Sequence, residues 1–285
     1  MSDMNTPYGE FICLPTGDFE MGNDKSYHTT CGRICREHTH ARHVHRVEIK
    51  RKLAFLSTPL TCAAMARFIV QYPGMVKDTN FSFKIYNDPD GEYALGDSTN
   101  HPSKDSKLVS TFSYWTSSCN ATLPAAGLSW SEAAIVCHTI GREIGNVVRL
   151  PTEAEWEFAC KAGTSSVYYF GNDTSQVATR AWCCTNSDLE PKPVMGFGPN
   201  PWGLYDIAGN VWEWCQDKYS TTFYSRSPIS DPICNDCEGV ENERRVIRGG
   251  SSMNKAETCR SSHRFGLPPV SRDRFLGFRP IIEIL

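Results

Sequence analysis

The densest group of residues that could do chemistry lies between Asn200 and Trp214, where oxygen-bearing side chains alternate with tryptophans. Asp206, Asn210 and Glu213 all offer oxygen donors, and three tryptophans fall within thirteen residues. These tryptophans are expected to be buried, since each can bury roughly 150–250 Å². A carboxylate buried among them must be paired or must hold a cation. The stretch therefore predicts an apolar hub that carries either a cation or a dense hydrogen-bond network.

Cysteines form the second group with potential chemistry. The chain has 13 of them, so at least one thiol stays free if all the others pair within the chain. Several fall within helical patterns, where a cysteine behaves as a small buried hydrophobe, and we expect most to be reduced. Two pairs, Cys31 with Cys35 and Cys234 with Cys237, could assemble a four-thiolate zinc site. They could also form local disulfides or stay free, and no second C-x-x-C supports zinc.

A run of histidines, His38, His40, His43 and His45, leads into a predicted strand at 44–49. A spacing of two places alternate side chains on one strand face, which would suit a metal ion. The simpler interpretation is a solvated basic segment. We favour that interpretation, because no carboxylate–histidine pattern accompanies the run.

Length and composition indicate one domain covering residues 1–285, without internal repeats or a low-complexity linker. The net charge of −3 gives no reason to expect nucleic acid or an anionic membrane as partner. No apolar run approaches the ~18 residues that span a bilayer. The N-terminus lacks the basic and apolar regions of a secretory signal, which leaves a cytoplasmic location or a virion or cell-surface association by another route. Phosphate-binding loops, nucleophile elbows and zinc-protease helices are absent from the sequence.

Two capping boxes predict helices around the centre of the chain. Ser129 with Glu132 begins a helix that runs to about residue 140 or beyond, and Thr152 with Glu155 begins a second one. The two helices flank a short predicted strand at 146–150. A loop-rich remainder follows, because glycine and proline interrupt every later apolar run.

The N-terminal part predicts two short strands, at 11–15 and 17–22, with a turn between them. Thr61 is placed to cap an amphipathic helix at 63–72, with apolar residues on one face. The following region, 77–122, is polar and has no sustained periodicity. It predicts a loop insert on the surface.

Six motifs occur along the chain in a fixed order and together span roughly residues 10 to 282. They are Phe19-Glu-Met-Gly22, Gly127-Leu-Ser-Trp-Ser-Glu-Ala133, Arg149-Leu-Pro-Thr-Glu-Ala-Glu-Trp-Glu-Phe158, the stretch Asn200–Trp214, Arg248-Gly-Gly-Ser251 and Leu276-Gly-Phe-Arg279. Their combination resembles the formylglycine-generating enzyme family, also called the sulfatase-modifying-factor domain. The resemblance implies an α+β fold of the C-type lectin-like type, loop-rich, with two or three helices and short antiparallel strands.

The resemblance also implies a metal site in the hub. The family's calcium ligands map to the side chains of Asp206 and Glu213 and to the backbone oxygens of Gly209 and Val211. All four donors are oxygens, which calcium prefers. We therefore predict one structural calcium ion at these four residues.

A second metal of the family is not expected here. Active members bind copper through two cysteines that lie just after the Arg-Gly-Gly-Ser element. In this sequence the first of these positions falls on or near Asn254, and only Cys259 remains. Copper(I) is a soft ion that requires such thiolates. We expect no copper and no formylglycine formation by the family mechanism.

The segment 252–275 lies between two fixed motifs and resembles the mutable C-terminal segment of variable proteins from diversity-generating retroelements. Cys259 and Arg264 would anchor it. This resemblance predicts a ligand-binding surface made of Ser252, Met253, Asn254, Lys255, Glu257, His263, Phe265, Leu267, Val270, Arg272, Arg274 and Phe275. The alternative is that the apolar members, Phe265, Leu267 and Phe275, simply pack in the core.

Two functions follow from these observations. The first is a non-catalytic ligand-binding protein that recognises a protein or cell-surface ligand through a C-terminal surface, which a retroelement could have diversified. The second is an oxidase or other modifying enzyme of the formylglycine-generating type that acts on a protein or peptide. The missing cysteine pair favours the first function.

Overall fold

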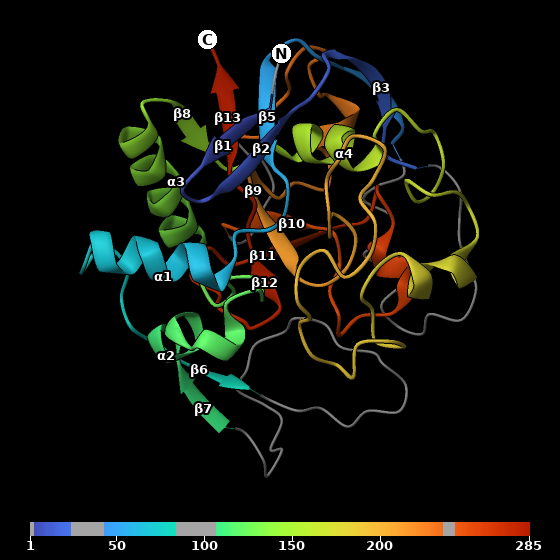
Figure 1. Cartoon of the computed structure of the whole chain (residues 1–285). Helices are drawn as coiled ribbons and strands as arrows, with labels where there is room; N and C mark the ends of the chain where they lie inside the picture. Colours follow the sequence, from blue (N-terminus) through green and yellow to red (C-terminus); the bar gives the residue numbers. More distant parts are fainter. Residues whose placement is uncertain (1–2, 24–42, 84–106, 236–242) are drawn as a thin grey trace.

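The computed structural model describes residues 3–23, 43–83, 107–235 and 243–285 (Figure 1). Two sheets form its centre, a five-stranded sheet of order β1-β2-β5-β13-β8 and a four-stranded sheet of order β11-β10-β9-β12. The first contains β1 (Met4–Thr6), β2 (Gly9–Cys13), β5 (Lys52–Leu56), β13 (Ile281–Ile284) and β8 (Val147–Arg149). The second contains β11 (Arg264–Leu267), β10 (Arg245–Arg248), β9 (Trp212–Lys218) and β12 (Leu276–Gly277). Short strands joined by long loops confirm the predicted lectin-like α+β fold.

The last strand, β13, is inserted between β5 and β8 and pairs antiparallel with both. This pairing joins the C-terminus to the N-terminal part of the sheet, and both chain ends lie at the same end of the molecule in Figure 1. Among the strand pairs that the structure describes, only β9 with β12 is parallel. A separate ribbon pairs β3 (Gly17–Met21) with β4 (His45–Ile49). The strands predicted at 11–15, 17–22, 44–49 and 146–150 are thus present, within one or two residues.

Both capping boxes are confirmed. Ser129 caps α3 (Trp130–Ile144) and Thr152 caps α4 (Glu153–Lys161), and in each case the glutamate three residues later bonds back to the cap. Helix α4 ends at Ala162, which adopts a left-handed conformation with φ of 46°. This helix contacts β3, β4, β9 and β10 and thereby joins the ribbon to the four-stranded sheet.

The third predicted helix is α1 (Cys62–Gln71), and Thr61 caps it by accepting a hydrogen bond from the backbone of Ala64. The loop prediction for 77–122 is wrong in its described part. That part contains β6 (Asn80–Phe83), β7 (Lys107–Ser110), α2 (Thr111–Thr116) and the 3₁₀ turn η2 (Ser118–Asn120). Helix α2 packs against α1, and its Trp115 is buried in the main core, so a polar sequence here still contributes core side chains.

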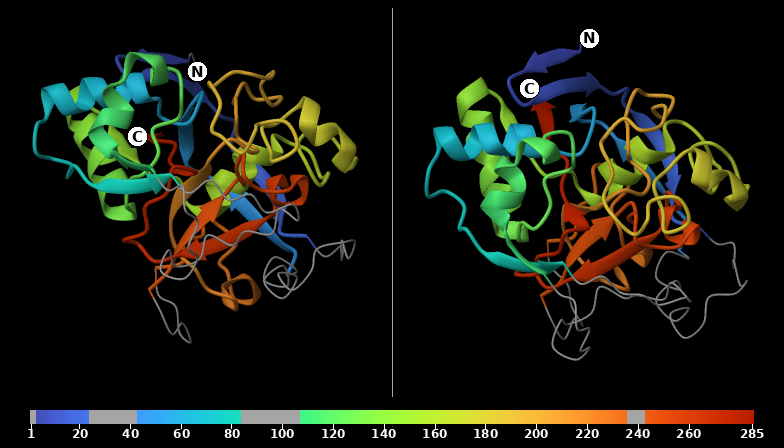
Figure 2. Two further views of the ribbon diagram at one scale, coloured as in Figure 1. Left: turned by 90° about the horizontal axis from the view of Figure 1, so that it is seen from below. Right: turned by 60° about the horizontal axis from the view of Figure 1, so that its bottom comes forward.

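The two sides of the molecule differ in regularity. Helices α1, α2 and α3 gather on one side, as both views in Figure 2 show. The opposite side carries α4 and β3 together with long loops, as Figure 1 shows. The loops of this half of the sequence include the short 3₁₀ turns η3 (Thr174–Thr179), η4 (Phe223–Ser225) and η5 (Ala256–Cys259). None of the described helices is long and apolar enough to cross a membrane.

Candidate functional site

The predicted aromatic hub is present for two of its three tryptophans, while Trp202 is only partly buried and packs against a different apolar cluster. Trp212 and Trp214, both on β9, are 3% and 0% exposed. The indole N–H of Trp214 donates to the backbone oxygen of Leu128 at 3.0 Å, and that of Trp212 donates to Asn254 Oδ1 at 2.9 Å. A buried indole N–H needs such an acceptor. These bonds tie β9 to the start of α3 and to the segment 252–275.

Glu213 lies between the two tryptophans, and its carboxylate is paired with a buried arginine. Arg279 Nη2 donates to Glu213 Oε1 at 2.9 Å, and Arg279 Nε lies 3.2 Å from each carboxylate oxygen. Trp156 Nε1 donates to Glu213 Oε2 at 2.8 Å. Arg279 also donates to the backbone oxygens of Leu56 and Tyr205. Every acceptor position on Glu213 therefore faces a protein donor, as a buried carboxylate requires.

Asp206, the other carboxylate of the predicted calcium site, has different partners. It accepts hydrogen bonds from the backbone N–H of Met195 at 2.7 Å and from Asn210 Nδ2 at 3.3 Å. Burial raises the pKa of Asp206 to about 6. Within the described ranges, no group of three or more histidine, cysteine or acidic residues is arranged to hold a metal ion. In this arrangement the carboxylate of Glu213 is directed at Arg279, and calcium binding at the four predicted residues stays a prediction.

The resemblance places the family's first copper cysteine on or near Asn254, and this residue has a buried amide side chain. Asn254 Oδ1 accepts from Trp212 Nε1 at 2.9 Å and from Ser251 Oγ at 2.6 Å, and the side chain is buried. Cys259 is buried in a separate apolar cluster, and burial raises the pKa of its thiol well above the usual value. The amide of Asn254 is a hard ligand, whereas copper(I) prefers thiolates.

The zinc and histidine predictions fall largely outside the described residues, which do not include Cys31, Cys35, His38, His40 and Cys237. Within the described part, the ring of His45 packs against Tyr224 with ring centroids 4.9 Å apart. Cys234 is buried, and its backbone N–H donates to Asp217.

Half of the residues predicted to display a binding surface are buried, and that expectation is wrong for them. Leu267 and Phe275 are 5% and 3% exposed, and Leu267 belongs to the main apolar core. The buried members of the predicted surface are Ser252, Asn254, His263, Leu267, Arg274 and Phe275. Two of them bond inward through their side chains: Arg274 Nη2 donates to the backbone oxygen of Leu189 at 2.8 Å, and Asn254 Oδ1 accepts from Trp212. The core alternative therefore holds for Leu267 and Phe275.

The other six predicted residues keep at least part of their surface and lie in two places. Met253, Lys255 and Glu257 surround the start of η5, which packs against η3. Phe265, Val270 and Arg272 belong to β11 and the turn that follows it. In that turn the backbone oxygen of Pro269 accepts a hydrogen bond from Trp130 at the start of α3, and Val270 is 77% exposed.

The anchors of the segment are stronger than the sequence suggests. Arg264 Nε and Nη2 donate to the two carboxylate oxygens of Glu153 at 2.6 and 2.7 Å, and both side chains are buried. Arg248, which begins the preceding motif, pairs with Glu157 one helical turn further along α4. Two arginines from the β10–β11 pair are thus held by two glutamates on one face of α4.

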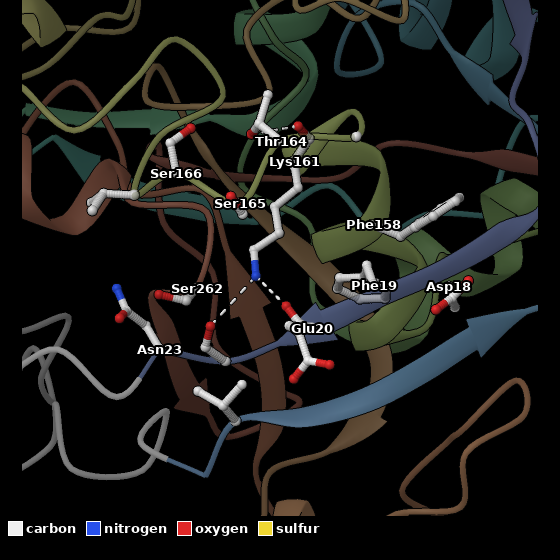
Figure 3. Close-up of a pocket in the computed structure, with 14 residues that line it drawn as sticks. Asp18, Phe19, Glu20, Asn23, Phe158, Lys161, Thr164, Ser165, Ser166 and Ser262 are labelled. Carbon is white, nitrogen blue, oxygen red and sulfur yellow. Dashed lines mark hydrogen bonds between the residues drawn. The ribbon is translucent and has the colours of Figure 1, made fainter.

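A pocket of about 320 Å³ opens beside this face of α4, between β3 and the loop that follows the helix (Figure 3). Its lining includes Phe19, Glu20, Phe158, Lys161, Ser165 and Ser262. Ser262 comes from the predicted recognition segment, and Phe19, Glu20 and Phe158 belong to sequence motifs, but no local pattern predicts that they line a pocket with Lys161 and Ser165. The only local signal is the hydroxyl run of Thr164, Ser165 and Ser166 immediately after a glycine that ends a helix.

The α+β fold of short strands and long loops, with the buried tryptophans of β9, defines a lectin-like scaffold of the formylglycine-generating type. The family model described as "Sulfatase-modifying factor enzyme 1-like domain" matches residues 1–284. The chain belongs to this family, which confirms the resemblance seen in the sequence.

Curated relatives cover about half of the chain. The formylglycine-generating enzyme of Streptomyces coelicolor is 34% identical over 172 residues, which are 55% of this chain and 51% of that protein. The inactive C-alpha-formylglycine-generating enzyme 2 of Bos taurus is 32% identical over 175 residues, 55% of this chain and 49% of that protein. The chain thus spans about half the length of these relatives.

Two solved structures share the fold along the whole chain. PvdO from Pseudomonas aeruginosa has a TM-score of 0.75 at 21% identity and covers 99% of this chain and 98% of its own. Treponema denticola variable protein 1 has a TM-score of 0.66 at 19% identity and covers 100% of both chains. At these identities the similarity establishes the common fold.

Proposed function

We propose that this chain is a non-catalytic ligand-binding protein on a formylglycine-generating-enzyme scaffold. The observation that carries the proposal is Asn254, whose amide oxygen accepts hydrogen bonds from Trp212 and Ser251 where the family's first copper cysteine is expected. A copper(I) ion has no soft ligand at that position. The name of the bovine relative, which includes the word inactive, is consistent with a member of the family that does not catalyse the reaction.

Recognition in this proposal is carried by the exposed parts of segment 252–275. The buried pairs of Arg264 with Glu153 and Arg248 with Glu157 hold the backbone on both sides of η5, whatever residues the exposed positions carry. Substitutions at exposed positions rarely disturb a fold. The segment can therefore change its contact residues without losing its shape, which suits a surface selected for binding.

The partner is a protein or another cell-surface ligand, since the net charge of −3 offers no attraction for nucleic acid. Lys255 and Glu257 supply the charged contacts of this surface beside Met253. The test uses a display library of protein fragments as the probe. Fragments selected by the wild-type protein should lose binding to a Met253→Ser, Lys255→Ala, Glu257→Ala variant with an unchanged melting temperature. Selected fragments that bind this variant as well as wild type would contradict the assignment.

The competing function is a modifying oxidase, which the 34% identity to an active enzyme of the family favours. It is tested directly by incubating the chain with a Cys-x-Pro-x-Arg peptide, copper(I) and oxygen. We expect no aldehyde product, because Asn254 and the buried thiol of Cys259 do not provide a thiolate pair. Turnover that disappears in a Cys259→Ser variant would overturn the binding proposal and establish the enzyme.

A further inference from the structure

The pocket beside α4 has the dimensions of a small-molecule site. Its volume of about 320 Å³ lies at the lower end of the range for such sites, ~300–1,000 Å³. Four separate parts of the chain form it, namely β3 with residue 23, Val44 just before β4, the end of α4 with the following loop, and Ser262. Because these parts are fixed by the β3–β4 ribbon and by α4, the pocket is preformed.

The cation in the pocket is already fully used by the protein. Lys161 Nζ donates to the backbone oxygens of Glu20 and Gly22, as the dashed lines in Figure 3 show, and lies 2.9 Å from Glu157 Oε1. An ammonium group has three N–H donors, and these three acceptors account for all of them. A phosphate, sulfate or carboxylate ligand would find no free donor on Lys161.

Hydroxyl groups supply the hydrogen-bonding capacity that remains. In the described hydrogen-bond network, the side chains of Ser165 and Ser262 have no protein partner, although Ser262 is only 5% exposed. The neighbouring hydroxyls of Thr164 and Ser166 donate to backbone oxygens at 2.8 and 2.6 Å and keep their lone pairs as acceptors. The pocket therefore offers several neutral donors and acceptors within a small space.

A carboxylate and an aromatic wall complete the site. Glu20 is exposed at the mouth and forms no ion pair with the described residues, so its oxygens can accept from ligand hydroxyls. Phe19 and Phe158 form the wall, with ring centroids 5.4 Å apart, and Phe158 is further held by an edge contact with Trp202. Lys161 Nζ lies 5.5 Å from the centroid of the Phe19 ring, and the remaining aromatic surface can pack against the C–H groups of a ligand while its hydroxyls reach the polar side.

We infer that this pocket binds a neutral polyhydroxylated ligand, a sugar ring or comparable polyol, with its hydroxyls on Ser165, Ser262 and Glu20 and its C–H face on Phe19 and Phe158. The site goes beyond the proposed recognition surface. It takes a small molecule, and it stands whether or not the exposed parts of 252–275 bind a protein.

The experiment titrates the full chain with simple sugars and measures binding by saturation-transfer NMR and calorimetry. The probes are methyl glucoside and methyl mannoside, with glucosamine and a hexose phosphate as charged comparators. For a ligand of this size we expect a dissociation constant on the order of 1–10 mM for the better neutral sugar. The hexose phosphate should bind more weakly, because Lys161 has no donor left for it.

Three variants assign the binding to the pocket. Ser262→Ala removes a hydroxyl without a described protein partner and should weaken binding about two- to tenfold with an unchanged melting temperature. Ser165→Phe fills the pocket from an exposed position and should abolish binding even if Ser262→Ala folds poorly. Glu20→Gln keeps a carbonyl acceptor and should weaken neutral-sugar binding less than about tenfold. Ser118→Ala, at an exposed serine in η2, is the matched control and should change nothing.

Each opposite result overturns the inference. If neither methyl glycoside binds saturably, neutral sugars are not the ligands of this pocket. Binding that survives Ser165→Phe unchanged would place it elsewhere on the molecule. Tighter binding of glucosamine than of methyl glucoside, lost in Glu20→Gln, would make this a site for amines instead of neutral sugars.

Discussion

The tryptophan hub and the pocket beside α4 contain the same kinds of polar groups, but they differ in how far these groups are hydrogen-bonded to the protein. In the hub, Glu213 accepts from Arg279 and Trp156, and Asn254 accepts from Trp212, so this carboxylate and this amide both have protein partners. In the pocket, Lys161 is saturated while the hydroxyl of Ser262 is not. A buried group with all its partners stabilises the fold, whereas an unpaired one is available to a ligand.

Glu157 connects the two regions. One carboxylate oxygen pairs with Arg248, which belongs to the sheet that holds the hub, and the other pairs with Lys161 at the pocket. The helix α4 thus serves as a common support for both. We therefore expect substitutions in the hub to lower the stability of the protein, and substitutions in the pocket or on the exposed segment to lower ligand binding.

The largest effect is expected from breaking the hub pair. Arg279→Met leaves Glu213 buried without its counter-ion and removes the donors to Leu56 and Tyr205. We expect the free energy of unfolding to fall by about 3–5 kcal/mol in urea denaturation. Adding Glu213→Leu to the same chain should recover part of the loss, since no buried charge is then left unpaired. A single variant as stable as wild type would show that the pair does not hold the hub together.

A core residue of segment 252–275 gives the next largest effect. Leu267→Ala removes a side chain that is 5% exposed within the main apolar cluster. The expected loss is about 2–4 kcal/mol, from lost apolar burial and the cavity left behind. Urea denaturation of the variant measures it. A loss below about 0.5 kcal/mol would indicate that Leu267 is exposed and belongs to the recognition surface predicted from the sequence.

The features that could be predicted from the sequence are those set by short local patterns. Ser129 and Thr152 were recognised as helix caps because a capping box is a four-residue pattern, and the structure contains both. Asn254 could be singled out from its place in a motif. Whether an apolar residue such as Leu267 is displayed or buried depends on which strand pairs beside it, and periodicity does not reveal that pairing.

The parts that were missed are assembled from distant segments. Trp115 is buried because α2 packs against α1, although the surrounding sequence is polar. The pocket joins Glu20, Lys161 and Ser262, which are separated by about a hundred residues or more. Arg279 was noted as part of a motif, but its pairing with Glu213 spans 66 positions and was not foreseen. Contacts between such distant residues can be identified only in the folded structure.

The pH dependence of stability tests the residue shared by both regions. Burial alone raises the pKa of Glu157, but Lys161 and Arg248 bring it below its ordinary value. A lowered folded-state pKa stabilises the protein above the unfolded pKa of about 4.3, and this contribution is lost as the pH falls through the folded value. The urea midpoint should therefore fall between about pH 5 and about pH 3. If a Glu157→Gln variant kept the full decrease of the urea midpoint with falling pH, other carboxylates would be responsible for that decrease.

A small effect is expected from the exposed turn of the same C-terminal segment. Val270 is 77% exposed, so Val270→Ser should change the free energy of unfolding by no more than about 0.5 kcal/mol. Paired with Leu267→Ala, it separates the displayed part of the segment from the part that belongs to the core. A loss as large as that of Leu267→Ala would mean that Val270 is covered in solution.

The smallest effect is expected from removing calcium. The sequence predicted an ion held by Asp206 and Glu213, yet both oxygens of Glu213 accept from Arg279, and Oε2 also accepts from Trp156. A calcium ion would have to displace a buried arginine that makes two further backbone hydrogen bonds. We therefore expect the melting temperature of the wild-type chain to be the same in EDTA and in excess calcium. A melting temperature that falls in EDTA, recovers with calcium and becomes insensitive in Asp206→Asn would show that the ion replaces Arg279 as the partner of Glu213.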